Sequence, residues 1–132
     1  MMKILFWKKT EKNVGQTGEN TAVKYLKKKG YSILERNYKN KMGRQLGEID
    51  IIAKMKDEII FVEVKTRKMS GNGGSLPEEN ITYRKLERLN KIASSYIKTN
   101  NLWDFSFRFD AISIVIGKND VFEIRHLENI FR

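Results

Sequence analysis

The 132-residue sequence contains no cysteine, one histidine and one proline. Without cysteine, the chain cannot form a disulfide framework, a thiolate nucleophile or a cysteine-ligated zinc or iron–sulfur site. Because His126 is the single histidine, a histidine-rich metal site is excluded, and a Ser-His-Asp arrangement would have to use His126 itself. The pattern around His126 indicates an ordinary strand-end residue rather than a ligand.

Long hydrophobic runs are also missing. The apolar stretches span only a few residues, whereas a membrane-spanning helix requires roughly 18–20. Near the start of the chain, the short apolar stretch at residues 4–7 is followed at once by Lys8 and Lys9. It is therefore too short for the apolar core of a signal peptide. The sequence predicts a cytoplasmic protein with no membrane partner.

Positive charge is in excess. The sequence contains 26 Lys and Arg but only 16 Asp and Glu, which gives a net charge of +10. A cytosolic domain of this charge attracts polyanions, and nucleic acid is the abundant one. The alternative is a lysine-rich composition with a solvated surface. The hydrophobic content of 40% is enough for a core, so the chain is expected to fold rather than remain disordered.

A single domain is expected at residues 13–132, preceded by an N-terminal tail at residues 1–12. The glycine-rich stretch at residues 69–75 indicates a loop within this domain, because neither half of the chain has a full core alone. It is either a mobile loop at a substrate cleft or a connector without a role. Helices are predicted over about residues 17–29 and 82–99, with a last helical turn at 127–132.

Strands are predicted at residues 31–37, 47–54, 58–66, 105–116 and 121–126. The order of elements predicts an α/β fold, with a central mixed sheet of about five strands and helices packed on it. Gly30 is well placed to end the first helix, and the lysines before it suit the negative end of the helix dipole.

The hairpin formed by the second and third of these strands has the most informative pattern. If Lys56 and Asp57 form its two-residue turn, Asp50 lies opposite Glu63 and Glu48 opposite Lys65. Since side chains alternate along a strand, four charged groups share one face: Glu48, Asp50, Glu63 and Lys65. The other face must be buried, and it carries Ile49, Ile51, Val62 and Val64. A slip by one residue would destroy this separation of polar from apolar side chains.

Directly opposed carboxylates have Cβ atoms only about 4.5–5.5 Å apart and repel one another. Lys65 supplies one positive charge, whereas a divalent metal supplies two and prefers carboxylate oxygens and waters. The alternative is an exposed charged face with Glu–Lys pairs across the strands.

Glu19 adds a third carboxylate on the stripe of the first helix that should face the core. If this helix packs over the hairpin, the carboxylates converge. Alternatively, Glu19 is a surface charge and the helix phase is misjudged by one residue.

Four short blocks carry a resemblance to a known family: Gly-Glu at residues 18–19, GEID at 47–50, FVEVKTR at 61–67 and RFD at 108–110. In this order they resemble the signature blocks of the YraN family, a set of small and mostly uncharacterised bacterial proteins. That family is similar to the Holliday-junction resolvases and the restriction-endonuclease-like superfamily, whose pattern is an aspartate followed by Glu-x-Lys. The resemblance covers roughly residues 14–130 and implies a restriction-endonuclease-like three-layer fold.

The resemblance implies a metal site for Mg²⁺ or Mn²⁺. Asp50 and Glu63 would be ligands, the carbonyl oxygen of Val64 a further ligand, and Glu19 would complete the site as the helix-borne acid. Glu48 matches the family motif and would either support the ligands from outside the coordination sphere or pair with Lys65. Asp110 also matches a family position, with a structural role beside Arg108 as the alternative.

For catalysis, the resemblance implies that Lys65 orients or deprotonates the attacking water and stabilises the phosphate in the transition state. Phosphodiester hydrolysis needs a metal that neutralises a nonbridging oxygen and makes a bound water acidic. A lysine beside that metal can have a lowered pKa or remain charged as an electrostatic clamp. Sequence does not choose between these two roles.

Nucleic-acid binding is predicted at six basic side chains, near the site and along one stripe of the second helix: Arg67, Lys68, Arg84, Arg88, Lys91 and Lys98. Any solvated helix can have such a stripe, so it supports DNA binding only together with the net charge. For Phe105, Phe107 and Phe109, core packing or a dimer contact is favoured over stacking on bases.

The sequence therefore predicts a metal-dependent endonuclease that hydrolyses phosphodiester bonds in DNA, with branched DNA suggested by family analogy alone. The alternatives are a non-catalytic nucleic-acid-binding protein that keeps the nuclease fold, and a scaffold whose basic face meets an acidic protein. The sequence does not determine the oligomeric state, but the same analogy suggests a homodimer as one option, since resolvases cut two strands with a two-fold pair of sites.

Overall fold

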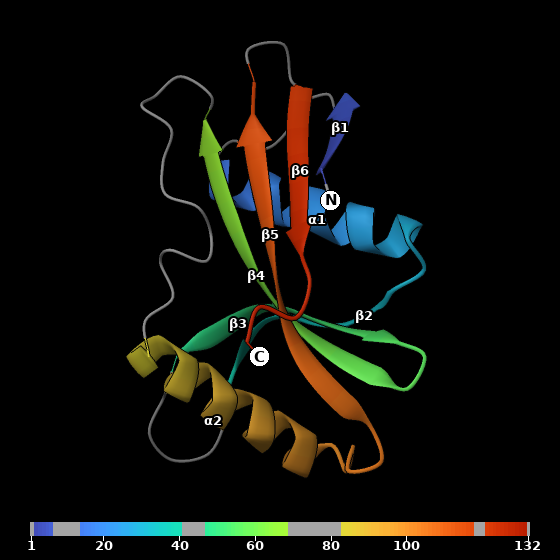
Figure 1. Cartoon of the computed structure of the whole chain (residues 1–132), viewed down its shortest axis with the longest axis vertical. Helices are drawn as coiled ribbons and strands as arrows, with labels where there is room; N and C mark the ends of the chain where they lie inside the picture. The colour runs from blue at the N-terminus through green and yellow to red at the C-terminus, as the bar shows by residue number, and fades with distance from the viewer. Residues whose placement is uncertain (1, 7–13, 41–46, 69–82, 118–120, 132) are drawn as a thin grey trace.

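In the computed structural model, one mixed β-sheet lies between two helices (Figure 1). The structure describes residues 2–6, 14–40, 47–68, 83–117 and 121–131. Its elements are β1 (Met2–Phe6), α1 (Val14–Lys28), β2 (Ser32–Lys39), β3 (Glu48–Met55), β4 (Glu58–Lys68), α2 (Tyr83–Thr99), β5 (Ser106–Ile116) and β6 (Val121–Leu127). The predicted three-layer α/β fold is confirmed.

The sheet has six strands in the order β1-β6-β5-β4-β3-β2, one more than the five or so predicted. The additional strand, β1, comes from the segment predicted as an N-terminal tail and pairs antiparallel with β6. β4 and β5 are parallel, and the other neighbouring strands are antiparallel. Among the described residues, neither helix is long and apolar enough to span a membrane.

The central hairpin has the predicted turn and register. β3 ends at Met55 and β4 begins at Glu58, and the pairing runs from Met55–Glu58 to Ile51–Val62. Lys56 in the turn has a positive φ of 54°, as two-residue hairpin turns commonly require. The alternation of side chains therefore determined the register correctly over these residues.

Each face of the sheet has its own hydrophobic core. On one face, α1 packs Ala22, Tyr25 and Leu26 against a cluster from the central strands that includes Ile51, Val62, Ile112 and Ile114. On the other face, α2 packs Ile92, Ala93, Tyr96 and Ile97 against Tyr38, Phe61 and Phe109. Burial of each such large side chain contributes about 1.5–3 kcal/mol, which is the main force that holds the layers together.

Ile49 departs from the predicted face. It was expected beside Ile51, but it lies in the α2-side cluster with Phe61, whereas Ile51 lies in the α1-side cluster. The two-residue alternation is therefore interrupted at Asp50, one position beyond the last described pair of β3 with β4.

The end of α1 follows the sequence closely. Gly30 has a φ of 97°, which L side chains rarely adopt and glycine accepts without strain. Its N–H donates to the carbonyl of Lys27, and the N–H of Tyr31 donates to that of Leu26. This pair of bonds is the Schellman motif and caps the free carbonyls of the last turn.

The C-terminal segment is not the predicted helical turn. β6 continues through Leu127, and the following residues return toward β5, where the N–H of Ile130 donates to the carbonyl of Phe109 at 2.8 Å. Ile130 and Phe131 pack against the α2-side cluster. Burial of these two side chains therefore overrides the weak local preference for a helical turn.

A buried polar network joins α1, β5 and β6. Asp110 is fully buried and accepts hydrogen bonds from the Arg108 guanidinium, His126 Nε2 and the Asn129 N–H, at 2.8–2.9 Å for the closest of each. Burial acts to raise the pKa of Asp110, but these donors outweigh it and lower the pKa below its ordinary value. This arrangement supports the structural alternative for Asp110.

His126 lies at the end of β6, as predicted, but it is more than an ordinary strand-end residue because it is part of this network. It is 4% exposed, and its Nδ1 lies 3.1 Å from the hydroxyl of Tyr25. Because the Asp110 carboxylate can only accept, Nε2 carries the proton and Nδ1 accepts from Tyr25 when the ring is neutral. The imidazole thus links β6 to α1.

Replacing Asp110 by alanine is expected to lower the free energy of unfolding by about 3–5 kcal/mol, because the buried His126 would lose its acceptor and Arg108 would lose one of its carboxylate partners. Urea denaturation followed by circular dichroism measures the change. The control is Asp104→Ala, since Asp104 is exposed and its loss should change stability by less than about 0.5 kcal/mol. Equal stability of the two variants would contradict a role for Asp110 in holding the fold together.

Candidate active site

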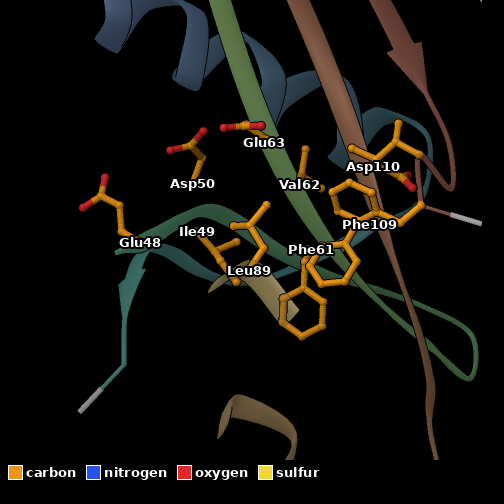
Figure 2. Close-up of a pocket in the computed structure, with 11 residues that line it drawn as sticks. Glu48, Ile49, Asp50, Phe61, Val62, Glu63, Leu89, Phe109 and Asp110 are labelled. Carbon is orange, nitrogen blue, oxygen red and sulfur yellow. The ribbon is translucent and has the colours of Figure 1, made fainter. Parts of the chain in front are cut away.

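The predicted site lies where β3 separates from β4. Beyond Ile51–Val62, the carboxylate of Asp50 takes the place of a main-chain acceptor, and its Oδ2 accepts the N–H of Val64 at 2.8 Å. Figure 2 shows the carboxyl groups of Glu48, Asp50 and Glu63 on one side of the hairpin, away from the apolar side chains. The parting of the strands therefore creates a gap into which acidic groups project.

The charges of the other three predicted acids act on Asp50, which is half-buried. Burial raises the pKa of Asp50 from about 3.8 to about 6. The Val64 N–H opposes this rise, whereas the negative charges of Glu19, Glu63 and Glu48 add to it. The ionisation of Asp50 is therefore disfavoured both by burial and by the three other carboxylates.

Glu19 reaches this position because α1 crosses very close to β4. Gly18 permits the approach, since a Cβ there would lie 1.8 Å from Thr66 Oγ1. Glu19 itself is 3.6 Å from the guanidinium of Arg36 on β2. The first helix therefore packs against the β4 strand of the hairpin, which is the condition under which Glu19 was expected to approach the other acids.

Glu63 has a partner that the sequence reasoning missed. Its Oε1 lies 2.5 Å from Nζ of Lys85, and the two side chains are only 19% and 25% exposed. Lys85 precedes Leu89, Ile92 and Tyr96 by four, seven and eleven residues, so it lies on the edge of the apolar stripe of α2. A cation on such a stripe needs a buried counter-charge, and this signal was available in the sequence.

Lys65 is half-buried on β4, next to Ser113 of β5 in the parallel ladder. Within the described part of the chain, no carboxylate forms an ion pair with its Nζ, so the predicted pairing of Lys65 with Glu48 does not occur there. Val64 packs its side chain against the α1-side cluster. The proposed roles of the Lys65 ammonium and the Val64 carbonyl remain predictions.

The donor set suits a hard dication, because it consists of carboxylates and a carbonyl and includes no imidazole. The ionisation of the half-buried Asp50 is opposed by three other acids, and a bound dication would relieve this repulsion. In the positions that the side chains adopt, no three Asp, Glu or His residues in the described ranges lie close enough to hold a metal ion. The ion pairs of Glu63 with Lys85 and of Glu19 with Arg36 account for this spacing.

The predicted nucleic-acid-binding residues fall on two elements. Arg67 and Lys68 end β4, with Lys68 exposed, and Arg84, Arg88, Lys91 and Lys98 are all exposed on α2. Arg88 also lines a cleft between α2 and the start of β3, together with Gly47, Glu48, Lys85, Leu89 and Ile92. The glycine-rich loop predicted near the site lies outside the described residues.

An apolar pocket adjoins the acidic groups beneath α2 (Figure 2). Glu48, Asp50 and Glu63 form its acidic side, and Ile49, Phe61, Leu89 and Phe109 form part of its apolar wall. Phe109 is 7% exposed, so core packing is confirmed for this ring, whereas Phe107 is 38% exposed. The site therefore has a charged side toward the gap between the strands and an apolar side toward α2.

Comparison with known proteins agrees with the motif resemblance. The model of the uncharacterised protein family UPF0102 matches residues 18–114, which include the four carboxylates and both Lys65 and Lys85. A UPF0102 protein of Clostridium acetobutylicum is 43% identical over 92% of this chain and 95% of its own length. A UPF0102 protein of Clostridioides difficile is 45% identical over 91% of this chain and 97% of its own length.

Asp50→Asn is expected to stabilise the metal-free protein above about pH 6. Because the folded pKa of Asp50 lies above the unfolded value, wild-type stability falls as the pH rises from about 4 through about 6, and the full penalty persists above that. Asparagine keeps an acceptor for Val64 and removes the charge, so the free energy of unfolding should rise by about 1–3 kcal/mol near pH 8 and little near pH 3.5.

Urea denaturation in the presence of a chelator, at both pH values, measures this difference. The matched control is Asp57→Asn in the exposed hairpin turn, which should be neutral at both. A destabilised Asp50→Asn protein at pH 8 would show that Asp50 serves the fold rather than a site.

Proposed function

This chain belongs to the UPF0102 family, the YraN family of the motif analysis, and we propose that it is a metal-dependent endonuclease that hydrolyses phosphodiester bonds in DNA. The observation that carries the proposal is the half-buried Asp50 carboxyl, which accepts the Val64 N–H and has a raised pKa with three other acids acting on it. Such a group is costly for stability, and perturbed carboxyls of this kind are concentrated at functional sites.

In this proposal, Asp50 and Glu63 hold Mg²⁺ or Mn²⁺ with the carbonyl of Val64, and Glu19 completes the set from α1. The metal supplies charge neutralisation at a nonbridging phosphate oxygen and an acidified water. The hydrogen bond from the Val64 N–H to Asp50 fixes the carboxylate beside β4, which orients it before a ligand arrives. Glu48 adds negative potential at the edge of the site.

Lys65 supplies the remaining group that the reaction needs. It lies two residues beyond Glu63 on the same strand, so its side chain leaves the same face of β4. Since no carboxylate in the described ranges neutralises it, its ammonium is available to the attacking water or to the phosphate. This is the position that an electrostatic clamp on the transition state requires.

The substrate is proposed to be DNA in the cytoplasm, bound by its phosphates. The net charge of +10 and the exposed cations of α2 and the end of β4 supply sequence-independent contacts. Branched DNA, and a homodimer that cuts two strands, rest on the family resemblance to resolvases.

Cleavage of labelled DNA tests the proposal. The wild type is expected to cut DNA in the presence of Mg²⁺ or Mn²⁺ and not with a chelator, and Asp50→Asn and Lys65→Ala should each lower the rate by about 100-fold or more. Four-way junction, linear duplex and single strand are compared side by side, so that the substrate ranking tests the resolvase analogy.

Matched control variants are Asp57→Asn in the hairpin turn and Lys27→Ala in the last turn of α1, which alter exposed groups and should cut at the wild-type rate. Cleavage that survives in Asp50→Asn would rule out the assigned chemistry and indicate a contaminating nuclease or another site.

A second candidate function is nucleic-acid binding without cleavage. The ion pairs of Glu63 and Glu19 favour it, because both acids already have cationic partners. In that case, affinity for DNA should fall steeply with salt, while Asp50→Asn and chelators leave it unchanged. Binding of this kind, with no cleavage by the wild type, would replace the endonuclease proposal.

A further inference from the structure

The contact between Lys85 and Glu63 joins the helix that carries the basic stripe to the strand that carries the acidic site. Lys85 Nζ is 2.5 Å from Glu63 Oε1, and about four-fifths of each side chain is shielded from solvent. It is a closer and better shielded pair than that of Arg36 with Glu19, whose nearest atoms are 3.6 Å apart and whose arginine is 41% exposed. Glu63 therefore has a resident cation.

The surroundings of Lys85 contain a second place for its ammonium. The cleft between α2 and the start of β3 is lined by Lys85 and Arg88 from the helix and by Glu48 from the strand. Arg88 is exposed. It lies three residues beyond Lys85, a little less than one helical turn, and therefore on the same side of α2. The flexible four-carbon stem lets a lysine ammonium move between such positions while its helix stays in place.

We propose that Lys85 is an exchangeable counter-ion: a divalent metal displaces it from Glu63, and the released ammonium then binds a substrate phosphate together with Arg88. This inference rests on the proposed metal site. A dication and an ammonium repel each other strongly at one carboxylate oxygen, so metal and Lys85 compete for Glu63. An anionic phosphate at the mouth of the cleft is the partner that suits the displaced cation.

Metal binding and DNA binding are consequently coupled through one side chain. In the metal-free protein, the Lys85 ammonium is paired with Glu63 and contributes little to the basic surface that binds DNA phosphates. With metal bound at Glu63, the displaced Lys85 ammonium adds its positive charge to that basic surface. Such coupling is reciprocal by linkage, so DNA should also tighten the binding of metal.

Two binding measurements without turnover test this inference. Titration calorimetry with Mn²⁺ alone is expected to show about tenfold tighter binding to Lys85→Met than to the wild type, because the competitor is gone. Lys85→Arg keeps the charge and should stay close to the wild type. Lys91→Met is the charge-matched control, since Lys91 is an exposed lysine of the same helix, and its Mn²⁺ affinity should also match the wild type.

Fluorescence anisotropy of labelled duplex DNA is the second measurement, with Ca²⁺ or a chelator present. Ca²⁺ should tighten DNA binding by the wild type, and Lys85→Met should lose this gain. Lys91→Met should bind more weakly under both conditions and keep the gain, because its phosphate contact does not depend on metal.

The two proposals fail differently. Equal Mn²⁺ affinity of Lys85→Met and Lys91→Met, or a Ca²⁺-dependent gain retained in Lys85→Met, would overturn the role of Lys85 and leave the metal site standing. If Asp50→Asn binds Mn²⁺ as well as the wild type does, the metal site itself is refuted, and the exchange at Lys85 with it.

Discussion

The hydrogen bond from the Val64 N–H to the Asp50 carboxylate is the interaction on which the candidate site depends. In a continuous ladder, that N–H would donate to a main-chain carbonyl of β3. The Asp50 side chain would then project from the face of the sheet, opposite Glu63. Instead, the carboxylate satisfies the amide and the two strands part after Ile51–Val62. The gap admits acidic side chains from both strands, while a buried main-chain donor still has its acceptor.

Two carboxylates of this molecule, the buried Asp110 and the half-buried Asp50, have opposite electrostatic environments. Asp110 is surrounded by donors from Arg108, His126 and Asn129, which lower its pKa and stabilise its charged form. For Asp50, burial raises the pKa to about 6; the Val64 amide opposes this rise, and the charges of three acids add to it. The first carboxylate is compensated within the fold. The charged form of the second is disfavoured in the fold, and in the proposed site a metal cation would compensate it.

The helices on either face of the sheet contribute one polar group each to this region. α1 comes close enough to β4 only because residue 18 is glycine, and this approach carries Glu19 toward Asp50. α2 lies across the opposite face on an apolar stripe whose edge carries Lys85. The two hydrophobic cores therefore do more than stabilise the layers, since the position of each helix determines which charges surround the gap between β3 and β4.

The sequence by itself determined the local features of this protein. The turn at Lys56 and Asp57, the register of the hairpin, the cap at Gly30 and the set of acidic residues all follow from short-range periodicity, which depends on a few neighbouring residues.

The tertiary structure alone decided the features that depend on distant contacts. Ile49 changes faces because β3 leaves β4, and His126 is buried because Asp110 and Tyr25 enclose it. The C-terminal segment is not helical because Ile130 and Phe131 pack against the α2-side core. Lys85 lies between these cases: its place on the apolar stripe was visible in the sequence, but only the packing of α2 on the sheet determined that its partner is Glu63.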